Sequence, residues 1–173
     1  MKRALLVVLV LLLSVSLIGC LSQGAEAQSE KEGQQKEETQ QGNELDEKAV
    51  ASLVEGFGSK LQTVSLLAPK DILEKSMQEN YSDFVSQELL AKWINDPLNA
   101  PGRLTSSPWP DRIEILTIEK SAKYEYEVKG KIIEVTSTEK ASGGIAAKRP
   151  ITLIVRKIND RWLIDDVTLG AYE

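Results

Sequence analysis

Histidine is absent from the 173 residues of the chain, and Cys20 is the single cysteine. Without histidine the chain lacks the most common general base and the most common metal ligand. This excludes Ser-His-Asp and Cys-His catalysis, histidine-based zinc sites and facial-triad iron sites. A single cysteine cannot form an intrachain disulfide, so a folded domain has to depend on its hydrophobic core. We expect neither a cofactor nor a metal site.

Basic side chains are also in the minority, with 21 Lys and Arg against 26 Asp and Glu. Proteins that bind nucleic acid carry basic patches, so the net charge of −5 argues against a nucleic-acid partner. The same negative charge gives the chain no electrostatic attraction to an anionic lipid surface, and it is typical of a soluble exterior.

The chain has one long apolar run, at its N-terminus. Lys2 and Arg3 precede an uncharged segment from Ala4 to Ile18. As a helix this segment would be about 22 Å long, which is less than the roughly 30 Å of a bilayer core. A positive start, a short apolar core and small residues are typical of a cleaved secretory signal. The alternatives are an ordinary signal peptide with a chance cysteine and an uncleaved single span.

The segment Leu17-Ile18-Gly19-Cys20 resembles the lipobox of bacterial lipoproteins. The resemblance implies that residues 1–19 are removed, that Cys20 is acylated with palmitate-type chains, and that the protein is held at the extracytoplasmic face of the cell membrane. Removal of 19 residues from 173 would leave 154. Because Lys2 and Arg3 would be lost, 19 basic side chains would face 26 acidic ones, a net charge of −7.

A polar segment follows Cys20. Residues 21–42 are rich in Gln, Glu, Lys, Ser and Gly, and their one large apolar residue is Leu21. Such a segment buries too little surface to offset the entropy of ordering, so we expect residues 20–42 to be a disordered tether that spans roughly 25 Å. A binding tail is the alternative, although polar low-complexity segments are usually linkers.

Helical spacing of apolar residues begins after Asn43, which is a suitable N-cap. One apolar stripe predicts a helix from about Glu44 to Leu67. Pro69 starts a second predicted helix, which ends at about Glu79, because proline suits the first turn of a helix. A third covers residues 86–95, and Asp96-Pro97 ends it.

The loop from Asp96 to Asp111 contains four prolines and is long for a connection without structure, a property often linked to function. Trp109 lies between two of these prolines and would either anchor a partner or fold back over the core, which is the more common place for tryptophan. A groove near this loop could also be lined by three further residues: Trp93, Tyr81 and Arg103. The helical stripe that contains Trp93 favours a core position instead.

Four strands are predicted in the second half of the chain, at residues 112–120, 123–138, 148–158 and 161–169. In the second of these, Tyr124, Tyr126 and Val128 alternate with charged residues, and a change of phase after Gly130 predicts a bulge. Residues 139–147 are expected to form a mobile loop, and Asn159-Asp160 a tight hairpin turn.

Helices followed by antiparallel strands predict an α+β domain, with the helices packed on one face of a curved four-stranded sheet. This layout, together with the stretch from Tyr81 to Ser86 and the closing strand from Arg161 to Val167, resembles the nuclear transport factor 2-like (cystatin-like) superfamily. The resemblance implies a cone-shaped domain over residues 43–173, often with a pocket at its wide end. Enzymes, ligand binders, dimerisation modules and parts of secretion machinery share this fold, so the fold does not assign a function.

Enzymes of this superfamily generally use Asp, Tyr or His inside the cone. In the absence of histidine, an active site would resemble that of a ketosteroid isomerase, with a carboxylate beside phenols. Tyr124, Tyr126 and Asp166 are available, although strand alternation places both tyrosines in an ordinary core. Asp165-Asp166 could hold a cation through oxygen ligands, but no Asp-x-Asp-x-Asp loop supports this, and an exposed strand end is favoured.

We therefore expect no catalytic residues and a non-catalytic domain that binds or assembles with a ligand or an envelope protein. The candidate contact residues are Trp109, Trp93, Tyr81, Arg103, Tyr124, Tyr126 and Asp166. The alternatives are a small-substrate enzyme of the isomerase or dehydratase type and a structural subunit of an envelope or secretion complex. A homodimer through the sheet face is a further partner hypothesis.

Overall fold

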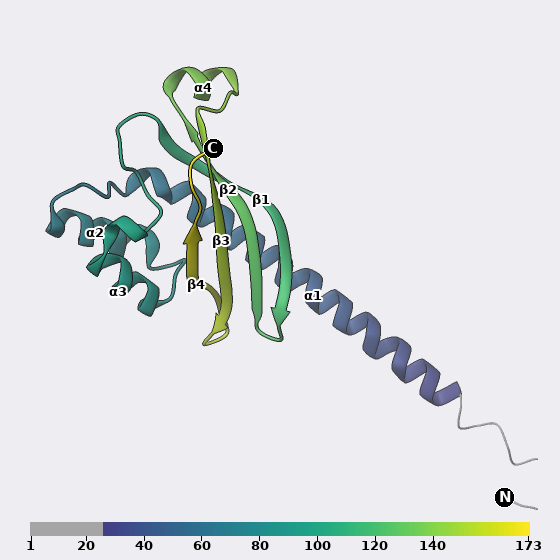
Figure 1. Cartoon of the computed structure of the whole chain (residues 1–173). Helices are drawn as coiled ribbons and strands as arrows, with labels where there is room; N and C mark the ends of the chain where they lie inside the picture. Colours follow the sequence, from purple (N-terminus) through teal and green to yellow (C-terminus); the bar gives the residue numbers. More distant parts are fainter. Residues whose placement is uncertain (1–25) are drawn as a thin grey trace, which may run out of the picture. The chain divides into compact units, whose positions relative to one another are not determined.

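The structure is a computed structural model that describes the backbone of residues 26–173 and the side chains of residues 41–173 (Figure 1). The predicted signal peptide and Cys20, the predicted site of lipidation, lie outside the described residues. Residues 41–173 form one compact unit, and all that follows on packing concerns this unit. Among the residues that the structure describes, no helix is both long enough and apolar enough to cross a membrane.

The first helix, α1 (Glu26–Lys60), begins well before the predicted start near Glu44 and is followed by a 3-10 turn, η1 (Leu61–Thr63). Residues 26–42, expected to be a disordered tether, are helical in the structure. Gln, Glu and Lys have good intrinsic helix propensity even where they bury little surface, and the prediction considered burial alone. Beyond residue 42, the apolar stripe packs as expected: Val50, Val54 and Phe57 are fully buried.

Two shorter helices follow, α2 (Lys70–Tyr81) and α3 (Gln87–Asn95), within two residues of the predicted bounds. Ser86 caps α3, because its hydroxyl oxygen accepts a hydrogen bond from the Leu89 N–H at 3.2 Å. After α3 the chain makes a second 3-10 turn, η2 (Pro97–Asn99). The loop predicted between Asp96 and Asp111 is therefore partly ordered, and its last residues already belong to the sheet.

The sheet has four antiparallel strands in chain order: β1 (Trp109–Ala122), β2 (Glu125–Val135), β3 (Ala147–Ile158) and β4 (Arg161–Leu169). Figure 1 shows the strands bending along their length. Side chains from α1, α2 and α3 share one hydrophobic core with one face of the sheet. The predicted α+β class, with N-terminal helices on a four-stranded antiparallel sheet, is confirmed.

The hairpin turns were predicted with unequal success. Asn159 and Asp160 have φ angles of 49° and 62°, which confirms a tight turn between β3 and β4. Lys123 and Tyr124 form the turn between β1 and β2, so the prediction that Tyr124 belongs to the alternating strand is wrong. Tyr124 is 54% exposed, because the alternation that buries Tyr126 ends where the chain reverses.

The predicted bulge near Gly130 lies on the neighbouring strand. The β1–β2 register shifts at three places in β1, which leaves Asp111, Leu116 and Ser121 without a partner residue in β2. Opposite Leu116, the pairing of β2 with β3 runs through Gly130 without a shift. The apparent change of phase in β2 arises because this strand is buried on both faces near its end.

A short helix, α4 (Ser137–Ser142), replaces the loop that was predicted from residue 139 to residue 147. Thr136 and Glu139 form a capping box at its start, in which the Thr136 N–H donates to the Glu139 carboxylate at 3.1 Å. Gly143, with a φ of 76°, ends the helix in the left-handed conformation. The Thr-x-x-Glu spacing was a readable signal for this helix.

The outer edge of β4 pairs with the segment that precedes α3. The Ser86 N–H donates to the Ile164 carbonyl at 2.8 Å, and the Ile164 N–H donates to the Phe84 carbonyl at 2.9 Å. Directly after Ile164, the extra residue Asp165 interrupts the register between β4 and β3. This pairing fixes the start of α3 against the sheet.

Candidate functional site

Three of the predicted contact residues lie in the hydrophobic core. Tyr81 and Tyr126 are fully buried, and Trp93 is 3% exposed. Trp93 stacks on Phe57 at 6.0 Å between ring centroids and meets the edge of Tyr81 at 5.9 Å. These aromatic side chains fill the space between the helices and the sheet.

The hydroxyl groups of the two buried tyrosines have different surroundings. The Tyr81 hydroxyl donates to the Pro101 carbonyl at 2.7 Å, and burial raises its pKa far above the usual range. The Tyr126 hydroxyl has no hydrogen-bond partner within the described residues, and its ring meets the edge of Trp162 at 5.2 Å. Asp166 is on β4, which β3 separates from Tyr126 on β2. The structure does not assemble the Asp/Tyr pair considered for an isomerase-like site.

The remaining predicted residues do not form the groove expected near the loop. Trp109 is half-buried at the start of β1, where it pairs with Val135 of β2. Arg103 belongs to a short parallel bridge: its N–H donates to the Val64 carbonyl at 2.8 Å, and its carbonyl accepts from Leu66 at 2.9 Å. Tyr81 and Trp93 contact each other in the core instead of facing a common opening with these two residues.

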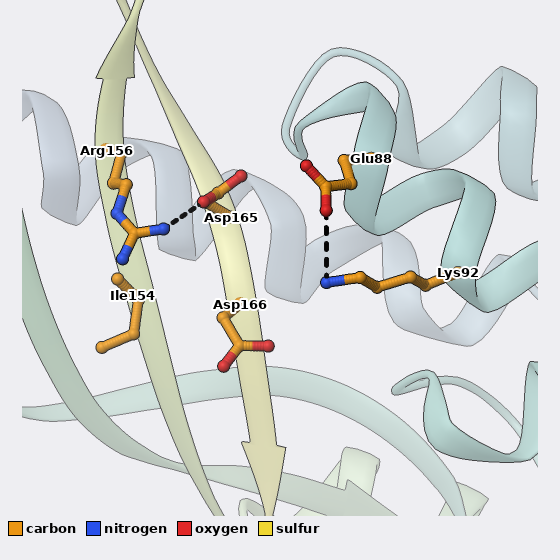
Figure 2. Close-up of a pocket in the computed structure, with 6 residues that line it drawn as sticks. All are labelled: Glu88, Lys92, Ile154, Arg156, Asp165 and Asp166. Atoms are coloured by element: carbon orange, nitrogen blue, oxygen red, sulfur yellow. Dashed lines mark hydrogen bonds and ion pairs between the residues drawn. The ribbon is translucent and has the colours of Figure 1, made fainter.

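A groove does lie elsewhere, between α3 and β4, and two of the predicted contact residues, Asp166 and Trp93, line it (Figure 2 shows the part that contains Asp166). One part of the groove, about 300 Å³, has a polar lining: Glu88, Lys92, Ile154, Arg156, Asp165 and Asp166. The adjoining part, about 470 Å³, has an apolar floor of Leu89, Trp93 and Val167, and its other lining residues are polar: Lys92, Asn95, Asp96, Asn99 and Asp166. Lys92 and Asp166 line both parts, so the two lie side by side along the groove.

The local fold explains why a groove opens here. Ser86 caps α3 and pairs with Ile164, so the first residue of the helix is held close to β4. The buried side chains of Leu89, Leu90 and Trp93 anchor α3 in the core, and Leu89 and Trp93 also reach the floor of the groove. The backbone pairing ends at Ile164, and beyond it the space between the helix and the strand is open.

An ion pair forms the polar wall of the groove. Arg156 on β3 binds the Asp165 carboxylate, and its Nε donates to Glu125 at 2.7 Å. Burial raises the pKa of Asp165, but hydrogen bonds from Ser86 and Arg156 and the charges of Arg156 and Lys92 outweigh it, so the pKa is lowered. Asp165 therefore stays ionised and is held in place by its partners.

Lys92 and Asp166 are the two charged residues that line both parts of the groove, and neither is held in a strong ion pair with another described residue. Figure 2 shows Lys92 extending from α3 toward β4. Its contact with Glu88, 3.7 Å long and exposed on both sides, is of a kind that contributes at most about 1 kcal/mol. Asp166 is exposed and makes no ion pair with any other described side chain. The arrangement combines an apolar floor with exchangeable charges, which suits binding.

Sequence reasoning identified Asp166 and Trp93 but missed the other groove residues. Lys92 and Glu88 follow the ordinary pattern of a solvated helix face, and Arg156 that of an exposed strand position. No local signal joins α3 to β4, because the pairing of Ser86 with Ile164 links segments far apart in the sequence. The Ser86 cap, readable from the start of the predicted third helix, was the one partial clue.

The outer face of the sheet, the predicted surface for a homodimer, carries several ion pairs. Lys129 contacts Glu127 at 2.8 Å, and Lys131 contacts Glu173 at 2.7 Å. A second copy packed on this face would have to remove water from these charges, which costs free energy. The homodimer remains a prediction.

Comparisons with protein-family models and with curated protein sequences found no match. Among solved structures, the chain is similar to an NTF-2 like protein of unknown function from Shewanella oneidensis MR-1. The TM-score is 0.42 at 16% sequence identity, and the alignment covers 73% of this chain and 99% of that chain. The function of that protein is unknown, so the similarity assigns no function to this chain.

Proposed function

We propose that the chain is a lipid-anchored, extracytoplasmic binding domain without catalytic activity, and that it holds its partner in the groove between α3 and β4. One observation carries this proposal. Aromatic side chains occupy the interior, where a superfamily enzyme would place its substrate, whereas accessible charges surround an open groove on the surface. An isomerase-like site would instead require a carboxylate beside a phenol, and β3 lies between Asp166 and Tyr126.

The groove supports recognition through two kinds of contact. Leu89, Trp93 and Val167 contribute an apolar floor in the wider part. Lys92 and Asp166 add one positive and one negative group at the rim. A partner that binds here would have to place groups of opposite charge next to each of them. Tryptophan in the floor of an interface is a typical centre of binding energy.

Site-specific photo-cross-linking in intact cells tests the groove. We expect a cross-linking amino acid at Lys92 to capture a partner of defined mass, and the same amino acid at Glu119 on β1 to capture none. The partner, once identified and purified, is expected to bind the Asp166→Lys variant at least about tenfold more weakly, because a rim charge is reversed.

The matched control is Glu119→Lys, which changes the net charge equally on the opposite edge of the sheet. Equal affinity of the partner for the unchanged chain and for Asp166→Lys would contradict binding in the groove. Turnover of a small molecule that survives Asp166→Lys and Lys92→Ala would contradict a non-catalytic role for the domain.

The membrane anchor is tested separately at Cys20. In cells fed radioactive palmitate, we expect the unchanged chain to be labelled and to fractionate with membranes, because several acyl chains on one residue give stable anchoring. Cys20→Ser is expected to lose all of the label. Ser22→Ala, which lies outside the lipobox, should keep it. Labelling of the Cys20→Ser variant would show that Cys20 is not the anchor.

A further inference from the structure

The outer edge of β4 is only partly paired. Ile164 exchanges both of its backbone hydrogen bonds with Phe84 and Ser86. Beyond Ile164, the backbone N–H and C=O groups of successive residues point in turn toward β3 and toward the open edge. The Gly170 N–H points toward β3, because it donates to the Pro150 carbonyl. The N–H and C=O groups of Leu169 and Val167, one and three residues earlier, therefore point toward the open edge. Within residues 41–173, the outward-facing N–H and C=O groups of Val167 and Leu169 form no backbone hydrogen bond.

This open edge borders the wider part of the groove, which Val167 lines together with Leu89 and Trp93. A strand placed beside β4 would turn alternate side chains to opposite sides. Side chains on the same side as Val167 would reach the apolar floor, and those on the other side would lie beside Asp166. The space of about 470 Å³ is in the range of protein sites that hold small ligands, which is enough for a few residues of extended chain.

The charges of the groove select among extended segments. Both positive charges of the groove are offset by carboxylates: Lys92 by Glu88, and Arg156 by Asp165 and Glu125. The negative charge of Asp166 has no such partner within the described residues. Asp96, at the other end of the lining, is a further carboxylate, which accepts a hydrogen bond from Asn99 at 2.6 Å. The whole chain is acidic as well, with a net charge of −5. Each of these features favours a basic partner.

We propose that the groove binds an extended peptide segment in which apolar residues alternate with Lys or Arg, and that this segment extends the sheet by pairing with Val167 and Leu169 of β4. Main-chain hydrogen bonds would then supply affinity, and the floor and the carboxylates would supply specificity. The inference rests on the proposed function, because it names the chemistry of the partner in the same groove.

The probe is a seven-residue peptide that alternates lysine and valine, with both ends blocked, added to the detergent-solubilised full chain. We expect it to slow amide hydrogen exchange at Val167 and Leu169 by at least about tenfold, because both N–H groups become hydrogen-bonded. Asp166→Lys is expected to weaken binding by about tenfold or more, and Glu119→Lys by less than about twofold. A peptide of alternating glutamate and valine should bind at least about tenfold more weakly.

A version of the probe with methylated backbone nitrogens separates strand addition from other binding, because it cannot donate main-chain hydrogen bonds. Equal affinity for both versions, or unchanged exchange at Val167 and Leu169, overturns strand addition. Absence of binding by the lysine-valine peptide, or protection of these amides that rises with protein concentration alone, overturns the peptide as occupant. The latter would mean that a second copy covers the edge.

The two proposals can fail independently. A partner captured at Lys92 that needs Asp166 but leaves exchange at Val167 and Leu169 unchanged would support the groove and overturn strand addition. Protection of these amides by the peptide, with no capture at Lys92 in cells, would support the peptide-binding edge and contradict its use by a cellular partner.

Discussion

Replacing Trp93 with alanine is expected to lower the free energy of unfolding by about 3–5 kcal/mol. The side chain is 3% exposed and contacts the rings of Phe57 and Tyr81, so its removal leaves a cavity among aromatic groups that are fixed by other contacts. Equilibrium denaturation in urea, followed by circular dichroism, measures the loss.

Trp109→Ala is the matched control, because it removes the same side chain from a half-buried position at the start of β1. We expect a clearly smaller loss of stability there, since part of the indole is already in contact with water. Equal losses for the two variants would contradict the assignment of Trp93 to the core. They would also remove the main reason for describing the interior as filled.

Gly58→Ala is expected to destabilise the domain by about 1–3 kcal/mol, although alanine is the better helix former by about 1 kcal/mol. A Cβ atom at Gly58 would lie 2.7 Å from the backbone nitrogen of Ile113 and 3.1 Å from its Cγ1 atom. Backbone cannot move aside as the end of a side chain can, so α1 would have to shift away from β1.

Gly42→Ala is the counterpart within the same helix, because nothing lies within 4 Å of the Cβ atom that it adds. Here the propensity of alanine should prevail and raise the free energy of unfolding by about 0.5–1 kcal/mol. Thermal unfolding of the two variants in parallel tests the pair. Stabilisation by both substitutions would show that α1 and β1 do not approach each other as closely as the structure describes.

The order and type of the main elements could be predicted from sequence because each depends on local patterns. The apolar stripe through Val50, Val54 and Phe57 has helical spacing, and Asn159-Asp160 has the chemistry of a tight turn. Tyr124 was misplaced because Lys123-Tyr124 carries none of the usual turn residues, so the strand alternation seemed to continue through it. The helix α4 was missed because its capping box was not considered.

The groove could be predicted only in part. Asp166 was a candidate because a carboxylate near the end of a strand is noticeable in a sequence. Its neighbours Lys92 and Glu88 come from a helix that only the pairing of Ser86 with Ile164 brings to β4. That pairing depends on tertiary packing. For Trp93 the sequence supports two positions, one in the core and one in a groove. The structure places its side chain in the core, and the small exposed part of it lines the groove between α3 and β4.

The three extra residues of β1 affect how copies of the protein behave when they are crowded. A long, regular edge strand invites edge-to-edge aggregation, and a lipid anchor would concentrate many copies in the plane of a membrane. Asp111, Leu116 and Ser121 interrupt the regular pairing of β1 with β2. The charged residues Arg112 and Glu114 lie between the first two of these interruptions. The irregular strand thus protects solubility at the edge that the proposed partner does not use.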